Sequence, residues 1–164
     1  MDERASQSNP DSLWTYQKGP RFSSASLQIL ETTKQLGLRY GETFAQSAFL
    51  LRGLVANTDI QNVLRAFDMS PVDILAQIDT AYPIDTDTPQ LDQEMPSVKI
   101  SNRLLSIINE AKTIAEQRKS PNTSPLHLFE ALVQSADGMG AYILESNGIT
   151  VEAYNTFLQR TRLT

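Results

Sequence analysis

The chain has 164 residues, no cysteine, one histidine and a formal charge of −5. Its length suits one domain, and an apolar content of 40% is enough to fill a core. The lack of cysteine excludes disulfides and thiolate metal sites, the single histidine excludes sites built on two imidazoles, and the acidic balance argues against nucleic acid as a partner.

The first residues predict an arm ahead of a folded domain. Residues 1–21 are mostly polar, and their large apolar side chains are Leu13, Trp14 and Tyr16. We expect a flexible arm, with Trp14 either docked on the domain or without a role. The start lacks the features of a signal peptide, and the chain has no apolar run of about twenty residues. We therefore expect a cytoplasmic protein that makes no contact with a membrane.

Two stretches of helical periodicity flank a proline-rich linker. Between residues 22 and 79, apolar residues recur three or four positions apart, as Leu27 and Leu30 do. Residues 80–99 carry three prolines and four acids, which is typical of a linker. Helical periodicity returns over residues 100–162. Strand signals are weak throughout, so we predict an all-α fold.

The two helical stretches align when the chain is shifted by 78 positions. The shift places Phe22-Ser23 on Ile100-Ser101, so each copy begins with a serine suited to cap its first helix. Two extra residues near Gly138 change the offset to 80. We predict about eight helices in two tandem four-helix repeats related by a pseudo-twofold axis. The expected divisions are an arm (1–21) and a domain (22–162) composed of repeat one (22–79), a linker (80–99) and repeat two (100–162).

Each copy also predicts where its third helix ends. Gly148 is suited to the left-handed conformation that stops a helix, and Asp68 stands at the matching position of the first copy. Ser70-Pro71 and Thr150-Val151 follow as cap and first helical residue of the fourth helix.

In this order, the motifs resemble the double repeat of the N-terminal domain of the Clp/Hsp100 unfoldases. The family pattern is an apolar-Ser/Thr cap, a Thr-Glu-His-like segment opening the second helix, a Leu-Leu-x-Gly-Leu core and a Leu-x-x-x-Gly-Val/Ile stop. The matching segments are Phe22-Ser23, 47–49, 50–54 and 64–69 in the first copy, and Ile100-Ser101, 125–127, 128–132 and 144–149 in the second. The resemblance covers residues 22–160.

The resemblance places a binding site at the starts of the second helices. In the family, an acid before the histidine helps to hold basic or arginine-phosphorylated clients. Here Ala48 and Leu126 replace that acid, and the histidine is kept only as His127. We therefore expect an apolar client- or partner-binding surface formed by Ala48, Phe49, Leu126 and His127.

Motifs for chemistry are missing from the sequence. The glycines at 37, 41 and 53 are not followed by the Gly-Lys-Ser/Thr of a phosphate-binding loop. A Ser-His-Asp set would have to use His127, which follows the expected cap Ser124 by three positions and is interpreted as a packing or capping residue. The acidic residues of the linker lack the glycine and terminal glutamate of a calcium loop. We expect no enzyme activity, no cofactor and no metal.

The resemblance implies two functions. The first is the substrate- or adaptor-binding module of an ATP-dependent Clp/Hsp100 chaperone, monomeric in isolation, that raises client concentration at a ring of ATPase modules. The alternative is a free-standing accessory protein that docks on the Clp ATPase or peptidase ring and regulates proteolysis. The long arm before Phe22 favours the accessory protein, whereas truncation of a longer chain would favour the chaperone module. A small hydrolase, a third class, would need a nucleophile and a base that the motifs do not supply.

Overall fold

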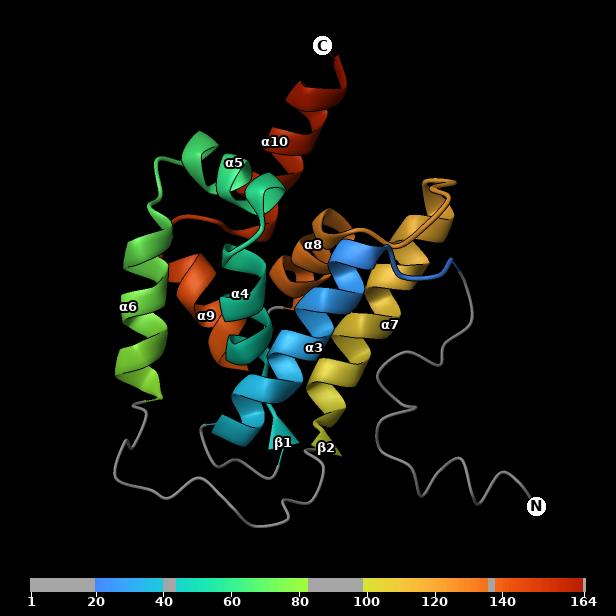
Figure 1. Cartoon of the computed structure of the whole chain (residues 1–164). Coiled ribbons are helices and arrows are strands. Elements are labelled where there is room, and N and C mark those ends of the chain that lie inside the picture. The colour runs from blue at the N-terminus through green and yellow to red at the C-terminus, as the bar shows by residue number, and fades with distance from the viewer. Residues whose placement is uncertain (1–19, 40–43, 83–98, 136–137, 164) are drawn as a thin grey trace, which may run out of the picture.

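The computed structural model of the chain describes residues 20–39, 44–82, 99–135 and 138–163, and in this part it contains eight helices (Figure 1). They are α3 (Ser24–Arg39), α4 (Ser47–Val55), α5 (Thr58–Ala66), α6 (Pro71–Ala81), α7 (Asn102–Gln117), α8 (Pro125–Ser135), α9 (Gly138–Ser146) and α10 (Val151–Leu163). The predicted all-α fold is confirmed. Most of the predicted arm, including Trp14, and most of the predicted linker lie outside the described residues.

The two repeats correspond helix by helix. α3 and α7 begin 78 positions apart, as do α4 and α8, while α5 and α9, and α6 and α10, begin 80 positions apart. The second copy therefore has two extra residues between the starts of its second and third helices, and α8 is two residues longer than α4. Positions related by these shifts are equivalent.

Short backbone bridges join the two repeats at the entrances to their first and second helices. Strand β1 (Phe44–Ala45) runs parallel to β2 (Lys99–Ile100), with Ala45 opposite Ile100. Phe22 forms a second parallel bridge with Thr123. Phe22 is equivalent to Ile100 and Ala45 to Thr123, so the pseudo-twofold axis relates one bridge to the other. Each bridge ties the first helix of one repeat to the second helix of the other.

The predicted caps are present at the first helices. Ser23 Oγ accepts a hydrogen bond from the Ser26 backbone N–H at 3.1 Å, and Ser101 Oγ accepts one from the Leu104 N–H at 3.1 Å. These bonds satisfy donors that have no partner inside the helix. The first helices therefore begin where the serines predict.

The predicted helix stops are present as well. Asp68 has a φ of 59° and Gly148 a φ of 90°, both in the left-handed region. Ser70 Oγ then accepts from the Val72 N–H at 3.2 Å, and Thr150 Oγ1 from the Ala153 N–H at 3.1 Å. Each copy thus ends its third helix and begins its fourth within a few residues.

The second helices, α4 and α8, form the centre of the domain (Figure 1). α4 packs against α3 and α6 of its own repeat and against α9 of the other, and α8 packs against α7, α10 and α5 in the equivalent way. Leu50 and Leu128, equivalent residues on these helices, have no exposed side-chain area. Both repeats therefore share one core. Among the described residues, no helix is both long and apolar enough to span a bilayer.

Candidate functional site

The start of α4 lies in the core. Ala48 and Phe49 have no exposed area, and the Tyr82 ring contacts the Phe49 ring edge-on, with 5.2 Å between centroids. The predicted apolar surface therefore does not include these two residues. Their apolar character reflects burial under α6 and α9.

The start of α8 reaches the surface. Leu126 is 37% exposed. His127 follows it in the first turn of α8, where its Nδ1 accepts a hydrogen bond from the Ser124 backbone N–H at 2.9 Å. A side chain three residues after the cap that accepts from the cap's N–H completes a capping box, with histidine in the usual place of glutamate. The capping role predicted for His127 is confirmed, and its client-binding role stays a prediction.

The protonation state of His127 follows from this bond and from burial. A ring nitrogen that accepts a hydrogen bond carries no proton, so the neutral ring holds its proton on Nε2. Burial lowers the pKa of His127, the positive charge of Arg118 lowers it further, and Glu130 opposes the shift. His127 is therefore a neutral group that fixes the α8 terminus.

Leu126 and His127 line a cavity of about 380 Å³ between α5, α8 and α10. We call it the α5–α8–α10 groove. Its apolar walls include Val63 of α5 and the half-buried Phe157 and Leu158 of α10. The remaining lining residues carry polar groups: Asp59, Asn62, Arg118, Ser124, Glu130, Tyr154 and Thr161.

An ion pair forms the polar end of this groove. Both Arg118 guanidinium nitrogens, Nη1 and Nη2, donate to the Glu130 carboxylate at 2.5 Å, and Gln134 Nε2 adds a third hydrogen bond at 3.2 Å. The Glu130 side chain is 3% exposed and that of Arg118 32%. The buried carboxylate is thus neutralised and hydrogen-bonded, and the groove presents no unpaired buried charge there.

An aromatic cluster holds α10 against the rest of the domain. The Tyr154 ring lies 5.6 Å from the Phe129 ring and 5.7 Å from the Phe157 ring, and Phe157 lies 5.5 Å from Phe67 at the end of α5. Burial raises the pKa of Tyr154, so its hydroxyl stays protonated. The cluster fixes α10 and leaves Phe157 and Leu158 along the groove.

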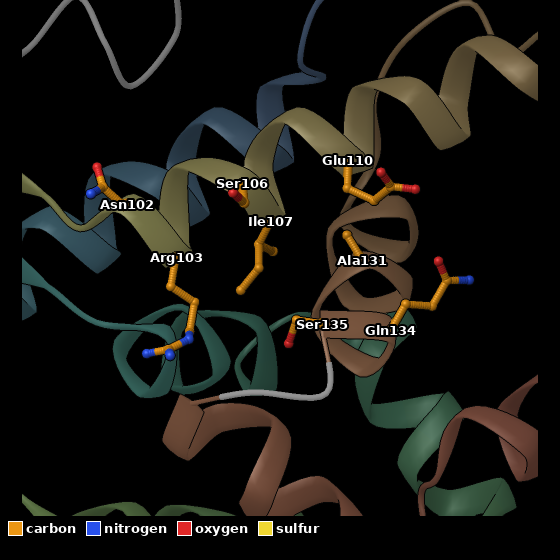
Figure 2. Close-up of a pocket in the computed structure, with 8 residues that line it drawn as sticks. All are labelled: Asn102, Arg103, Ser106, Ile107, Glu110, Ala131, Gln134 and Ser135. Carbon is orange, nitrogen blue, oxygen red and sulfur yellow. The ribbon is translucent and has the colours of Figure 1, made fainter.

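A second groove, which the motifs did not predict, lies between α7 and α8. Its cavity is about 630 Å³, and Figure 2 shows side chains from the two helices on its opposite sides. They are Asn102, Arg103, Ser106, Ile107, Glu110, Ala131, Gln134 and Ser135. This is the α7–α8 groove.

The α7–α8 groove has an equivalent in repeat one. Seven of its positions are equivalent to residues that line a smaller cavity of about 180 Å³: Ala25, Gln28, Ile29, Thr32, Gly53, Ala56 and Asn57. The second copy carries Arg103 and Glu110 where the first has Ala25 and Thr32. These differences between equivalent positions are visible when the two repeats are aligned, so the alignment could have indicated the charged lining of this groove.

His127 Nδ1 is engaged in the α8 cap, and no three His, Cys, Asp or Glu side chains gather as a metal site within the described ranges. The α5–α8–α10 groove combines an exposed leucine with aliphatic and aromatic walls. Of the four predicted site residues only Leu126 is exposed, and it lines this groove together with the buried His127, so we take the groove as the candidate site.

A comparison with known protein families finds a match in the second repeat. Residues 99–162 match the family profile of the Clp repeat (R) N-terminal domain. The predicted resemblance to the Clp N-terminal domain is thereby confirmed. No curated protein sequence matches the chain.

Solved structures confirm the fold over both repeats. One comes from preliminary structural investigations of a malarial protein secretion system, with 21% identity, 85% of this chain and 93% of that chain covered, and a TM-score of 0.69. The Hsp104 N-terminal domain from Candida albicans has 14% identity, 82% and 87% coverage and a TM-score of 0.66. The N-terminal domain of the caseinolytic protease associated chaperone ClpD from Arabidopsis thaliana has 16% identity, 84% and 94% coverage and a TM-score of 0.62.

Proposed function

We propose that this domain, with the Clp N-terminal domain fold, is a cytoplasmic substrate- or adaptor-binding module of a Clp/Hsp100 ATP-dependent unfoldase, without catalysis of its own. Residues 22–162 form the module, with an arm at 1–21 and a linker between the two repeats. The linker was expected at 80–99, but α6 continues to Ala81 and β2 begins at Lys99, so repeat one extends beyond the expected residue 79. The observation that carries the proposal is the α5–α8–α10 groove, where Leu126 is exposed beside aromatic and aliphatic walls.

The groove suits an apolar side chain presented by an unfolded segment. A buried aromatic side chain removes about 150–250 Å² from water, a gross gain of roughly 4–6 kcal/mol. Lost translational and conformational freedom offsets much of this gain, so one domain binds weakly. Several such domains on one ring would hold a client through avidity.

A titration with a labelled unfolded protein tests the groove. Fluorescence anisotropy of a dye-labelled casein is measured against increasing concentrations of the full chain. Leu126→Glu places a charge on the groove wall and is expected to weaken binding at least about fivefold, which corresponds to roughly 1 kcal/mol.

Leu27→Glu is the matched control. Leu27 is also an exposed helical leucine, 42% accessible, but it lies on α3 and is not among the residues that line the groove. Equal loss of binding in both variants, or no loss in Leu126→Glu, would contradict the proposal. Circular dichroism checks that both variants stay folded.

The mass of the native protein separates the module from the accessory alternative. An antibody against this domain should detect a band several times heavier than 18.3 kDa in a native lysate if the domain is part of an unfoldase. A band near 18.3 kDa would favour the free-standing protein that docks on a Clp ring.

A further inference from the structure

The chain enters the described structure at the edge of the α5–α8–α10 groove. Thr123 Oγ1 donates a hydrogen bond to the Pro20 carbonyl at 2.9 Å, and the Thr123 backbone N–H donates to the Arg21 carbonyl at 2.7 Å. Thr123 is buried, and the next residue, Ser124, lines the groove. The residues ahead of Pro20 therefore begin beside the groove.

Phe22 and Ser23, the next two residues along the chain, are also held in place by contacts with repeat two. Phe22 packs with its ring 4.6 Å from the Lys112 ammonium nitrogen, measured to the ring centroid, and Phe22 itself is 7% exposed. The Ser23 backbone N–H donates to the Thr123 carbonyl at 3.0 Å. The entry point is thus fixed by several bonds to one strand-like segment.

In repeat one, the place equivalent to the α5–α8–α10 groove is covered by side chains of its own repeat. Phe49, equivalent to His127, is contacted edge-on by the Tyr82 ring, and Ile78, equivalent to Leu158, has no exposed area. In repeat two Leu158 is half-buried, and the position equivalent to Tyr82 is an arginine, residue 162. The fourth helix of repeat two therefore brings no aromatic residue to the place that Tyr82 covers in repeat one.

The segment ahead of Pro20 carries aromatic residues within reach. Its sequence includes Leu13-Trp14-Thr15-Tyr16, and Trp14 is the only tryptophan of the chain. Pro20 follows Trp14 by six positions, a maximum extended length of about 20 Å at roughly 3.3–3.6 Å per residue. A helix of the length of α10 also spans about 20 Å. The segment can therefore reach along the groove from its edge.

We propose that residues 13–16 of this chain dock in the α5–α8–α10 groove, with an aromatic ring against Leu126 and Leu158. The occupant is intramolecular, and a short tether gives it an effective concentration on the order of millimolar. The regulatory consequence rests on the proposed function. A client or adaptor that uses the groove must displace the segment, so the domain binds partners less tightly than the bare groove would.

Fluorescence of Trp14 tests the docking in the full chain. A docked indole is expected to emit at shorter wavelength than free tryptophan amide and to resist quenching by acrylamide. Leu126→Glu should shift the emission to longer wavelength and increase quenching at least about twofold, while Leu27→Glu should leave both unchanged. The shift should not depend on protein concentration.

Three results would overturn the proposal. They are emission and quenching like those of free tryptophan amide in the native chain, a native-like signal retained in Leu126→Glu, and a blue shift that appears only as protein concentration rises. The last result would mean that the segment docks on a second copy. Circular dichroism confirms that each variant remains helical.

A second variant separates this inference from the proposed function. Trp14→Ser should raise the affinity for labelled casein several-fold by removing the competitor. Protected Trp14 with casein binding that is insensitive to Leu126→Glu would retain the docked segment and contradict the proposed function. Exposed Trp14 with casein binding that is sensitive to Leu126→Glu would contradict the docked segment and retain the proposed function.

Discussion

Gln77 and Asn147 exchange two hydrogen bonds between their side-chain amides, at 3.3 Å and 3.0 Å. The pair joins α6 of repeat one to the end of α9 of repeat two. The equivalent positions are Phe157 and Phe67, whose rings lie 5.5 Å apart between centroids. The pseudo-twofold axis therefore relates a polar joint to an aromatic one, and only the aromatic joint borders the α5–α8–α10 groove.

Truncating the aromatic joint should lower the free energy of unfolding more than truncating the polar joint. Phe157→Ala removes a half-buried ring from the aromatic cluster and should lower the free energy of unfolding by about 2–3 kcal/mol. Gln77→Ala should cost about 1 kcal/mol, because Asn147 keeps a hydrogen bond to the Ile143 carbonyl. Urea unfolding measures both values. Equal costs would contradict the distinction between the joints.

The pH dependence of stability should report the His127 cap. Burial lowers the pKa of His127 in the folded state, whereas the unfolded chain keeps the ordinary value near 6.5. As pH falls below about 6.5, His127 is protonated in the unfolded chain but stays neutral in the folded state. Stability therefore decreases until the pH reaches the lowered pKa of the folded state. His127→Gln retains an acceptor for the Ser124 N–H without titrating. Its unfolding free energy should change less than that of the native chain between pH 7 and 5, and parallel curves would refute the assignment.

Removing one partner of the Arg118–Glu130 pair should lower the stability of the domain more than removing both partners. Arg118→Met leaves the Glu130 carboxylate, 3% exposed, without its countercharge, and should destabilise the domain by about 3 kcal/mol. The double variant Arg118→Met/Glu130→Met should recover most of that loss, since no buried charge remains. Chemical denaturation of the single and double variants measures the coupling. A double variant as unstable as Arg118→Met would show that packing, not charge, is responsible.

The shared core gives a direct test of the repeat alignment. Leu50→Asp or Leu128→Asp buries a carboxylate where no side-chain area is exposed, at a cost of several kcal/mol against a typical total stability of about 5–15 kcal/mol. Either change should abolish cooperative melting followed by circular dichroism. A variant that kept full helicity and a cooperative transition would show that its leucine lies outside the common core.

Local sequence signals predicted most of the fold. The serine caps, the left-handed stops at Asp68 and Gly148, and the change of offset from 78 to 80 depend on neighbouring residues and on periodicity, and all are present in the structure. The binding surface depends on how helices from different repeats approach one another. The residues at the start of α4 and α8 have similar local patterns, so the sequence did not distinguish the buried start from the exposed one.

One contact explains why the two starts differ. The Gly140 backbone N–H of α9 donates to Ser47 Oγ at 3.1 Å, and a Cβ at Gly140 would lie 2.8 Å from the Ser47 carbonyl oxygen. α9 can therefore lie directly on the start of α4 and cover Ala48. At the equivalent position α5 has Ile60, whose side chain is fully buried. On this side a cavity lies between α5 and the start of α8, and Leu126 in its wall remains exposed.

Gly140→Ala should consequently weaken the packing of α9 against α4. The added methyl group must displace backbone, not a flexible side-chain end, so we expect a loss of about 1–3 kcal/mol in the free energy of unfolding. Gly148→Ala is the control: it meets no atom within 4 Å and carries only the strain of its φ of 90°, about 1 kcal/mol. Gly140→Ala should also increase amide hydrogen exchange at the start of α4, which Gly148→Ala should leave unchanged. Unaltered exchange at Ala48 and Phe49 in Gly140→Ala would mean that the close approach of α9 is not what buries them.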